Sequence, residues 1–262
     1  MSILLFKAYH WLAHRLRSIH LHGIHSPFVF YLHQTLIKEK AKYYAFDAIE
    51  SIRAKLLLTD KVIEVKDLGA GSQYSKGNKR SIRSIAQQSL KRPKEAQLMY
   101  RLVQEFKPKT ILELGTSLGI SIAYLAKAAP SAKITSIEGC PQTSKVALLN
   151  LKKLNIENVK VINGAFDDHI EEALIDLKVL DFLFIDGNHT EKATLRYFNA
   201  CLPYLSGKAI VVFDDIYWSK GMLNAWNKIR KNEKVAVSID LFELGILIFK
   251  RDQEKEHFTI YH

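Results

Sequence analysis

From Lys109 onward the sequence alternates between short apolar runs and amphipathic segments of helical length, and this alternation constrains the fold more than any other feature. The apolar runs predict buried strands at 110–114, 133–138, 158–163, 180–185 and 208–213. Segments with helical spacing fall at 119–129, 141–154, 167–176, 189–204 and 218–230. Strands joined by helices through short connections build a parallel sheet. We therefore expect an α/β fold with a doubly wound, mostly parallel sheet.

The last two apolar runs depart from this alternation. Residues 235–240 and 245–250 both have the composition of strands, but too few residues separate them for a helical crossover. Neighbouring strands with a short connection pair in antiparallel fashion. A terminal antiparallel hairpin is therefore predicted, and it brings the expected sheet to seven strands.

The first 92 residues precede the alternation, and we expect them to form a basic helical extension to a domain at 93–262. Residues 3–21 place apolar side chains at helical spacing, which is typical of an amphipathic helix. Its apolar face is expected to pack against the main domain or a second subunit of a homodimer, and the alternative is peripheral contact with an anionic membrane. Further helices are expected at 26–36, 45–58, 81–90 and 93–106, and Ser26 is expected to cap the first of them before Pro27.

The net charge of +11 is concentrated in the first part of the chain. Residues 1–110 hold 20 Lys and Arg against 8 Asp and Glu, whereas residues 111–262 hold 18 against 19. A basic surface attracts anionic partners such as nucleic acid, acidic lipid or a phosphorylated substrate. Solvated helix faces would produce the same pattern, so the charge by itself does not choose among these partners.

The cysteines and the hydropathy bear on the compartment. Cys140 and Cys201 offer no disulfide framework and no Cys-x-x-Cys metal site, so a reducing cytoplasm is expected. No apolar run approaches 18 residues, and Lys7 interrupts the apolar opening of the chain. We therefore expect neither a transmembrane helix nor a signal peptide.

Two glycines bracket the turn between the first predicted strand and the helix after it. Gly115 and Gly119 are separated by three residues, which is neither the dinucleotide fingerprint nor a phosphate-binding P-loop. Glycines in such a turn let backbone N–H groups and a helix N-terminus come close to a polar ligand. This turn is the first candidate for a ligand site, and an ordinary tight turn is the alternative.

A second glycine-bearing segment, residues 67–80, follows a strand-like run at 62–65. Polar and basic residues stand where the apolar face of a helix should begin, and no strand ending in an acid follows about 20 residues later. We interpret 67–80 as a basic, glycine-rich loop that could cover a substrate.

Carboxylates follow the predicted parallel strands, at whose carboxyl ends ligands gather in such sheets. Glu138 lies about 20 residues beyond the glycine turn, where an acid can bind the two hydroxyls of a ribose. Asp186, Asp214 and Asp215 end two other strands. Crowded carboxylates repel one another unless a proton or a cation lies between them, and oxygen ligands suit Mg²⁺, Ca²⁺ or Mn²⁺.

The motifs in this order resemble those of class I S-adenosylmethionine-dependent methyltransferases. They are 112–121 (LELGTSLGIS), 136–139 (SIEG), 163–167 (NGAFD), 184–189 (FIDGNH) and 213–215 (FDD). Within that group they are most similar to the cation-dependent O-methyltransferases of the catechol O-methyltransferase type, which have a Rossmann-like sheet with a terminal antiparallel hairpin. The resemblance covers residues 93–250.

The resemblance implies S-adenosylmethionine as cofactor, a small hydroxylated molecule as substrate and a divalent cation, with Mg²⁺ expected. Asp186 and His189 are implied as catalytic residues, His189 as a base near neutral pH. The implied metal ligands are Asp186, Asp214 and Asp215, although the O-methyltransferases usually have Asn at the place of Asp215. The implied cofactor-binding residues are Glu113, Gly115, Thr116, Ser117, Gly119, Ser121, Glu138, Gly139, Ala165, Phe166 and Asp186.

Three other functions remain open at this point. A nucleic-acid methyltransferase would use the basic first part of the chain, but 186–189 lacks the Asn/Asp-Pro-Pro-aromatic motif of base N-methylation. A non-catalytic scaffold would use the helical extension. A nicotinamide-dependent oxidoreductase is disfavoured by the glycine spacing and by the terminal hairpin.

Overall fold

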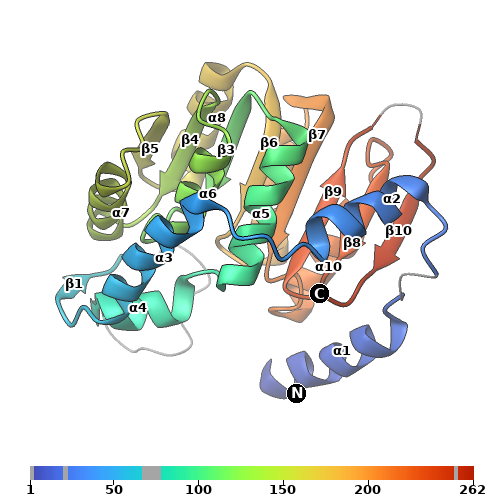
Figure 1. Ribbon diagram of the computed structural model, residues 1–262, viewed down its shortest axis with the longest axis horizontal. Coiled ribbons are helices and arrows are strands. Elements are labelled where there is room, and N and C mark those ends of the chain that lie inside the picture. The colour runs from blue at the N-terminus through green and yellow to red at the C-terminus, as the bar shows by residue number, and fades with distance from the viewer. Residues whose placement is uncertain (1–2, 20–22, 67–77, 251–252) are drawn as a thin grey trace. The chain divides into compact units, whose positions relative to one another are not determined.

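The computed structural model describes residues 3–19, 23–66, 78–250 and 253–262 (Figure 1). The chain divides into two compact units. The terminal unit consists of Met1–Lys40 together with Val179–His262, and the middle unit is Ala41–Lys178. The predicted boundary between residues 92 and 93 stays a prediction.

The middle unit contains a parallel three-stranded segment of sheet and the helices that connect its strands. β3 (Thr110–Leu114) pairs in parallel with β4 (Lys133–Glu138), which pairs in parallel with β5 (Val159–Asn163). The helices of this unit are α3 (Tyr44–Leu57), α4 (Ile82–Ser89), α5 (Pro93–Phe106), α6 (Ile120–Ala128), α7 (Pro141–Lys153) and α8 (Phe166–Leu177).

The core of the middle unit lies around β3 and α6. Every residue of α6 is buried except Lys127, as expected of a helix that is apolar on all sides. α6 packs against α5 and α3, and its Tyr124 lies among Phe46 and Tyr100. The Tyr124 hydroxyl donates a hydrogen bond to Glu50 of α3 at 2.7 Å. The helices before the glycine turn are therefore part of the packing that supports it.

A two-stranded antiparallel ribbon connects α3 to α4. It consists of β1 (Val62–Glu64) and β2 (Lys79–Ser81). Of the loop predicted at 67–80, residues 67–77 lie outside the described residues, and Lys79 and Arg80 belong to β2, so the loop prediction was wrong for these two. The backbone N–H of Lys66 contacts the Cys140 sulfur at 3.4 Å, which fixes the ribbon beside the start of α7.

The terminal unit holds the remaining strands and helices. β6 (Leu180–Ile185) pairs in parallel with β7 (Leu205–Asp214), and β7 pairs in antiparallel fashion with β9 (Leu244–Ile248). The predicted hairpin is confirmed, because β8 (Val237–Asp240) pairs in antiparallel fashion with β9. The helices are α1 (Ile3–Arg17), α2 (Pro27–Leu32), a π-helical turn (His33–Ile37), α9 (Glu191–Cys201) and α10 (Lys220–Ile229).

The predicted fold class is confirmed, with one strand more than the seven expected. β10 (Glu256–Thr259) pairs in parallel with β8. Within the terminal unit the strand order is β10-β8-β9-β7-β6, and within the middle unit it is β3-β4-β5. β10 is only four residues long and includes two polar residues and a histidine, so its sequence carries little strand signal.

The cap predicted for α2 differs from the observed one. Ser26 precedes Pro27 as expected, but its side chain makes no capping hydrogen bond. Its hydroxyl donates instead to the Glu256 carboxylate at 2.7 Å, at the beginning of β10. The residue that looked like a local helix cap therefore connects α2 to a strand far along the chain.

Helix α1 is amphipathic as predicted, but it does not pack through its apolar face. His14 and Phe6 are buried, whereas Leu4 and Leu16 are 77% and 78% exposed. The imidazole side of the helix faces the protein, and the larger apolar side faces outward. None of the helices in the described parts of the chain has both the length and the apolar character to cross a membrane.

Candidate functional site

The turn after β3 has the backbone conformation that its glycines permit. Gly115 and Gly119 have φ values of +109° and +83°, and Ser117 between them has +48°. The Gly115 N–H donates to the carbonyl of Ile137 in β4 at 3.0 Å, which holds the turn beside the end of the neighbouring strand. A Cβ on Gly119 would lie 3.0 Å from the Ala147 Cβ, so α7 packs directly against this position. The second glycine is thus required both by its φ value and by a close helix contact.

Glu113 is completely buried one residue before the end of β3. Its two carboxylate oxygens accept hydrogen bonds from Ser121 at 2.6 Å and from Ser136 at 2.5 Å. Burial raises the pKa of Glu113 to about 7. The two hydroxyl donors lower this pKa, and the charge of Glu138 raises it by a smaller amount. Thr116 joins the cluster through a 2.5 Å hydrogen bond with Ser136.

Glu138 ends β4, and three donors hold its carboxylate. The Ser117 N–H donates to it at 2.7 Å, the Cys140 N–H at 2.9 Å and the Thr143 hydroxyl at 3.0 Å. The glycine turn and the start of α7 are therefore joined through one side chain. An acid predicted to bind ribose hydroxyls is positioned rigidly by backbone N–H groups, with Gly139 beside it in the same loop.

The loop after β5 lies next to Glu138. The Gly164 N–H and the Asn163 side chain both donate to the Glu138 carbonyl, at 3.0 and 2.8 Å. Ala165 is the N-cap residue of α8 and Phe166 its first residue, and both are partly exposed. The structure thus brings the predicted adenine-bordering residues to the loop that neighbours the predicted ribose-binding acid. We call this whole set the cofactor cluster: 113, 115–117, 119, 121, 136, 138–140, 143 and 163–166.

A separate group of ligating side chains lies in the terminal unit. Asp186 follows β6, Asp214 ends β7, and His189 precedes α9. One ligating atom from each lies within 4.8 Å of those of the other two. Asp214 is buried, and the other two are partly exposed. We call these three residues the acidic cluster.

Asp215 is placed differently from its sequence neighbour and is not in the acidic cluster. Its φ is +52°, and its carboxylate lies 3.7 Å from the Lys7 ammonium of α1. The same ammonium lies 4.2 Å from the centre of the Trp218 ring, and that ring is 5.9 Å from His189. The set that the structure brings together is therefore Asp186, Asp214 and His189, and not the predicted set with Asp215.

The donor atoms of the acidic cluster fit a divalent cation. The two carboxylates supply the oxygen ligands that Mg²⁺ and Mn²⁺ prefer. The imidazole is a ligand that Mn²⁺ and the transition metals after it in the first row accept more readily than Mg²⁺ does. The imidazole Nε2 of His189 lies 3.7 Å from an Asp186 oxygen, so both can point toward one ion. His189, predicted as a base, is therefore placed where it could serve as a ligand.

Sequence reasoning missed several residues that complete these clusters. Ser136 is opposite Glu113 in the parallel register of β3 and β4, so correct strand pairing would have found it. Thr143 sits two residues inside α7, within reach of the acid that ends the preceding strand. Lys7 is 208 residues away from Asp215 in sequence, and no local pattern signals that contact.

Comparison with known proteins agrees with these arrangements. Residues 112–216 match the model of a family described as a methyltransferase domain. The human transmembrane O-methyltransferase is 36% identical over 81 residues, which are 30% of this chain and 28% of that protein. Pig catechol O-methyltransferase is 32% identical over 97 residues, 36% of this chain and 52% of that protein. The alignments thus span about half or less of these relatives.

Solved structures share the fold at lower sequence identity. An O-methyltransferase from Bacillus cereus in complex with SAH has a TM-score of 0.57 at 17% identity, over 84% of this chain and 96% of that one. The Podospora anserina methyltransferase PaMTH1, also bound to SAH, has a TM-score of 0.59 at 15% identity, over 85% and 94%. Residues 112–216 therefore match a methyltransferase domain, and in sequence and fold this chain is similar to the S-adenosylmethionine-dependent O-methyltransferases, as its motifs predicted.

Proposed function

We propose that this protein transfers a methyl group from S-adenosylmethionine to a hydroxyl oxygen of a small molecule, with a divalent cation at the acidic cluster. The observation that carries the proposal is the cofactor cluster, which lies entirely within the segment that matches a methyltransferase domain. Several relatives of this chain are named O-methyltransferases. The oxygen acceptor rests on that similarity.

The residues of the cofactor cluster have distinct roles in this proposal. The glycine turn offers backbone N–H groups to the methionine end of the cofactor, and Glu113 supplies a carboxylate beneath that turn. Glu138, fixed by three donors, accepts hydrogen bonds from the ribose hydroxyls. Ala165 and Phe166 border the adenine.

In the reaction, the carbon–sulfur bond of the sulfonium breaks as a carbon–oxygen bond to the acceptor forms. S-adenosylhomocysteine leaves, and the proton of the acceptor hydroxyl passes to a base or to solvent. A bound divalent cation would lower the pKa of a coordinated hydroxyl and so make its oxygen a better nucleophile. Asp186 and Asp214 would hold that ion.

His189 has two candidate roles, and the same ring nitrogen cannot fill both at once. As a third ligand, it would strengthen cation binding; as a base, it would accept the acceptor's proton. Electron paramagnetic resonance of Mn²⁺ titrated into the wild type and into His189→Gln separates the two. We expect the variant to bind Mn²⁺ at least about tenfold more weakly, because loss of a ligand weakens the site. Unchanged Mn²⁺ affinity with lost activity would assign His189 as the base.

Activity is tested with methyl-labelled S-adenosylmethionine and a panel of small phenols, catechols and aliphatic alcohols. We expect label in the oxygen of at least one hydroxylated compound, in the presence of Mg²⁺ or Mn²⁺, and a loss with chelator. Asp214→Asn should lower the rate by two orders of magnitude or more. Asp176→Asn, at an exposed ion pair with Lys133, serves as a matched control and should keep the wild-type rate.

Each possible outcome has a defined meaning. Label in nitrogen or in nucleic acid would contradict the proposed acceptor class and favour a nucleic-acid methyltransferase. Activity that survives chelator and Asp214→Asn would remove the cation from the proposal and leave the methyl transfer standing.

A further inference from the structure

We propose that the outward face of α1 binds the surface of an anionic phospholipid membrane. The proposal concerns a part of the molecule that the proposed methyl transfer does not use. It rests on three observations: the exposed apolar side chains of α1, the buried contacts that fix its rotation, and the charges along it.

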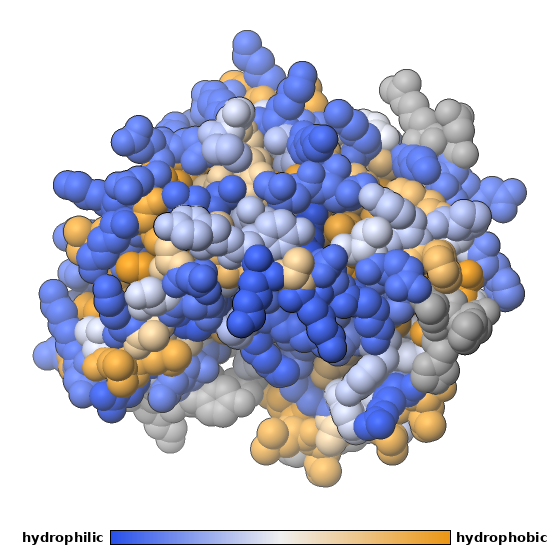
Figure 2. All heavy atoms as spheres, in the orientation of Figure 1, coloured by the Kyte–Doolittle hydropathy of each residue, from blue (hydrophilic) through white to orange (hydrophobic). Residues whose placement is uncertain are grey.

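The outward face of α1 is formed by large apolar side chains at helical spacing. Leu4, Leu5, Leu12 and Leu16 are 77%, 63%, 54% and 78% exposed. Tyr9 and Trp11 on the same side are also exposed. Apolar atoms gather over α1 in Figure 2, which has the same orientation as Figure 1. A contiguous apolar face of this kind normally has something bound to it.

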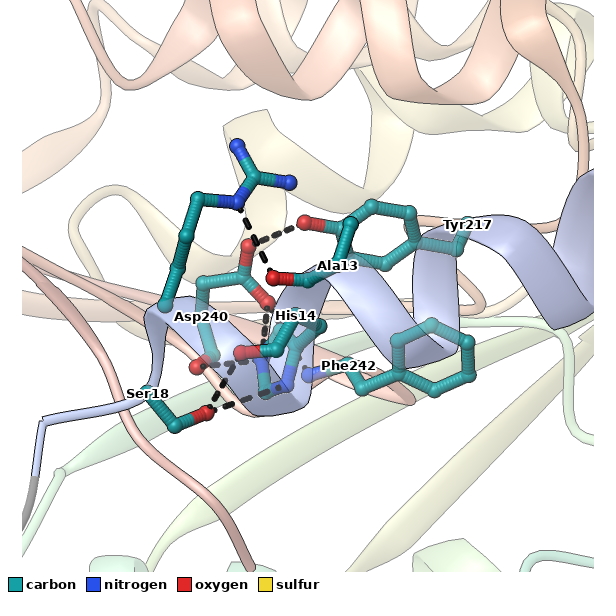
Figure 3. Close-up of polar contacts among 7 residues, drawn as sticks. Ala13, His14, Ser18, Tyr217, Asp240 and Phe242 are labelled. Carbon is teal, nitrogen blue, oxygen red and sulfur yellow. Dashed lines mark hydrogen bonds and ion pairs between the residues drawn. The ribbon is translucent and has the colours of Figure 1, made fainter.

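The rotation of α1 is fixed by polar contacts on its inner face (Figure 3). His14, which is 2% exposed, places its Nε2 3.1 Å from a carboxylate oxygen of Asp240 at the end of β8. The other oxygen of Asp240 accepts from the Tyr217 hydroxyl at 2.7 Å, and the Phe242 N–H donates to the first at 2.9 Å. The Ser18 hydroxyl completes the contact, 3.3 Å from Nδ1 of His14.

These contacts decide which side of the helix faces outward. A turn of α1 that buried its leucines would take His14 away from Asp240 and leave a buried carboxylate with one donor fewer, which costs free energy. Ring contacts lie on the same inner side: the His10 ring is 5.5 Å from the Tyr217 ring, and the Phe6 ring is 4.3 Å from the His10 ring. The exposed leucines are therefore a property of the folded terminal unit.

The charges of α1 favour an anionic partner. Lys7, Arg15 and Arg17 lie on the helix, and residues 3–17 contain no Asp or Glu. Arg15 lies over the rings of Trp11 and Tyr261, at 5.5 and 5.6 Å, so a cation and two aromatic rings share the outward side. Apolar side chains with Trp, Tyr and Arg among them are the composition of helices that lie in the headgroup region of a membrane.

The same charges disfavour a second copy of this chain as the occupant. Two α1 helices packed face to face would bring together the exposed Arg15 and Arg17 of each copy, four cations in all, and residues 3–17 contain no carboxylate to pair with them. Anionic headgroups would instead contribute about 1 kcal/mol for each Lys or Arg near the surface, equivalent to roughly thirtyfold in affinity for the two exposed arginines. We therefore choose the lipid surface and leave self-association as an outcome of the test.

The test is co-sedimentation of the full chain with vesicles of phosphatidylcholine alone or mixed equally with phosphatidylglycerol. We expect binding to the mixed vesicles that is roughly thirtyfold tighter than to the neutral ones and that weakens with salt. Leu5→Gln/Leu12→Gln/Leu16→Gln should abolish it, because these side chains supply the buried apolar area. The matched control is Leu58→Gln/Ile175→Gln, two exposed apolar residues of the middle unit, which should bind like the wild type.

Two further measurements keep the test decisive. Tryptophan emission should shift to the blue on vesicle binding, and Trp11→Phe should remove the shift. Far-ultraviolet circular dichroism and the melting temperature of the triple variant should match the wild type, since the replaced side chains are exposed. If the wild type sediments with mixed vesicles no better than the triple variant, the proposal is wrong. It is also wrong if the lipid-free protein is a dimer that the triple variant dissociates.

Discussion

At the scale of single residues, the carboxylates of the cofactor cluster differ sharply in their surroundings. Glu113 is fully buried and accepts from two hydroxyls, whereas Glu138 accepts from two backbone N–H groups and a hydroxyl in a partly exposed loop. Burial makes the charged form of Glu113 costly, and the hydroxyls compensate only in part. Glu113 is therefore expected to bind a proton near neutral pH.

Glu113 makes the stability of the protein depend on pH between about 4.5 and 7. Its pKa in the folded state is about 7, against 4.5 for an ordinary glutamate, so the folded state binds more protons than the unfolded state in this window. The free energy of unfolding contributed by this residue should therefore fall as pH rises through the window, by about 3 kcal/mol. Above pH 7 its contribution should be constant.

The measurement is urea denaturation of the wild type and of Glu113→Gln at a series of pH values from 5 to 8. Because the variant has no group to titrate at this position, its stability should lack this decline with pH. If the unfolding free energies of the wild type and of the variant differ by the same amount at all pH values, the raised pKa of Glu113 is contradicted.

At the scale of elements, the sequence predicted the helices and strands well because each has the periodicity of its type. The parallel strands, the glycine turn and the terminal hairpin were found from runs such as 110–114 and from the short spacing after 240. The sequence did not predict β10, the strand register of Ser136 or the hydrogen bond of Ser26 to Glu256. These depend on partners 19 or more residues away.

The acidic cluster shows the same limit. Asp186 and Asp214 were predicted because they end buried strands. Asp215 was placed with them because it follows Asp214 directly, but the chain turns at a φ of +52° and directs its carboxylate toward Lys7. The outward rotation of α1 was missed for a similar reason. Hydrophobic periodicity identifies an apolar face without showing what covers it. The rotation of α1 is fixed by the contact of His14 with Asp240, which lies 226 residues later in the chain.

The junction of α6 and α7 should not tolerate a side chain at Gly119. Gly119→Ala forces a Cβ into a left-handed residue and places it 3.0 Å from the Ala147 Cβ, so we expect a loss of roughly 2–4 kcal/mol in unfolding free energy. Gly221→Ala is the matched control, because its Cβ would make only ordinary contacts of 3.4 Å or more in helix α10. That control should be neutral or slightly stabilising. Equal effects of the two substitutions on thermal unfolding would contradict this reasoning.

The attachment of α1 should depend on Asp240. In the wild type, three donors share the two carboxylate oxygens of Asp240. Asp240→Asn keeps the size of the side chain but leaves one oxygen for these donors, so we expect the free energy of unfolding to fall by about 2 kcal/mol. Hydrogen exchange followed by mass spectrometry should show faster exchange in residues 3–17. Asp60→Asn, at an exposed ion pair with Arg83, should change stability by less than about 0.5 kcal/mol and leave exchange in α1 unaltered. Unchanged exchange of α1 in Asp240→Asn would show that the network does not hold the helix.

At the scale of the whole molecule, the basic character of the first part of the chain is explained in part by α1 and its proposed membrane contact. The middle unit carries the cofactor cluster, and the terminal unit carries the acidic cluster and α1. Binding of cofactor, binding of cation and binding of lipid are thus assigned to different sets of residues. Each can be removed by substitutions that leave the others in place.

The central claim is that the cofactor cluster binds S-adenosylmethionine, and calorimetric titration of the full chain with S-adenosylhomocysteine tests it most directly. We expect one site per chain, at least about tenfold weaker binding for Glu138→Ala because the ribose loses its acceptor, and unchanged binding for Glu172→Ala, an exposed acid of α8. Absence of heat at millimolar ligand, or equal affinity in all three proteins, would contradict the claim.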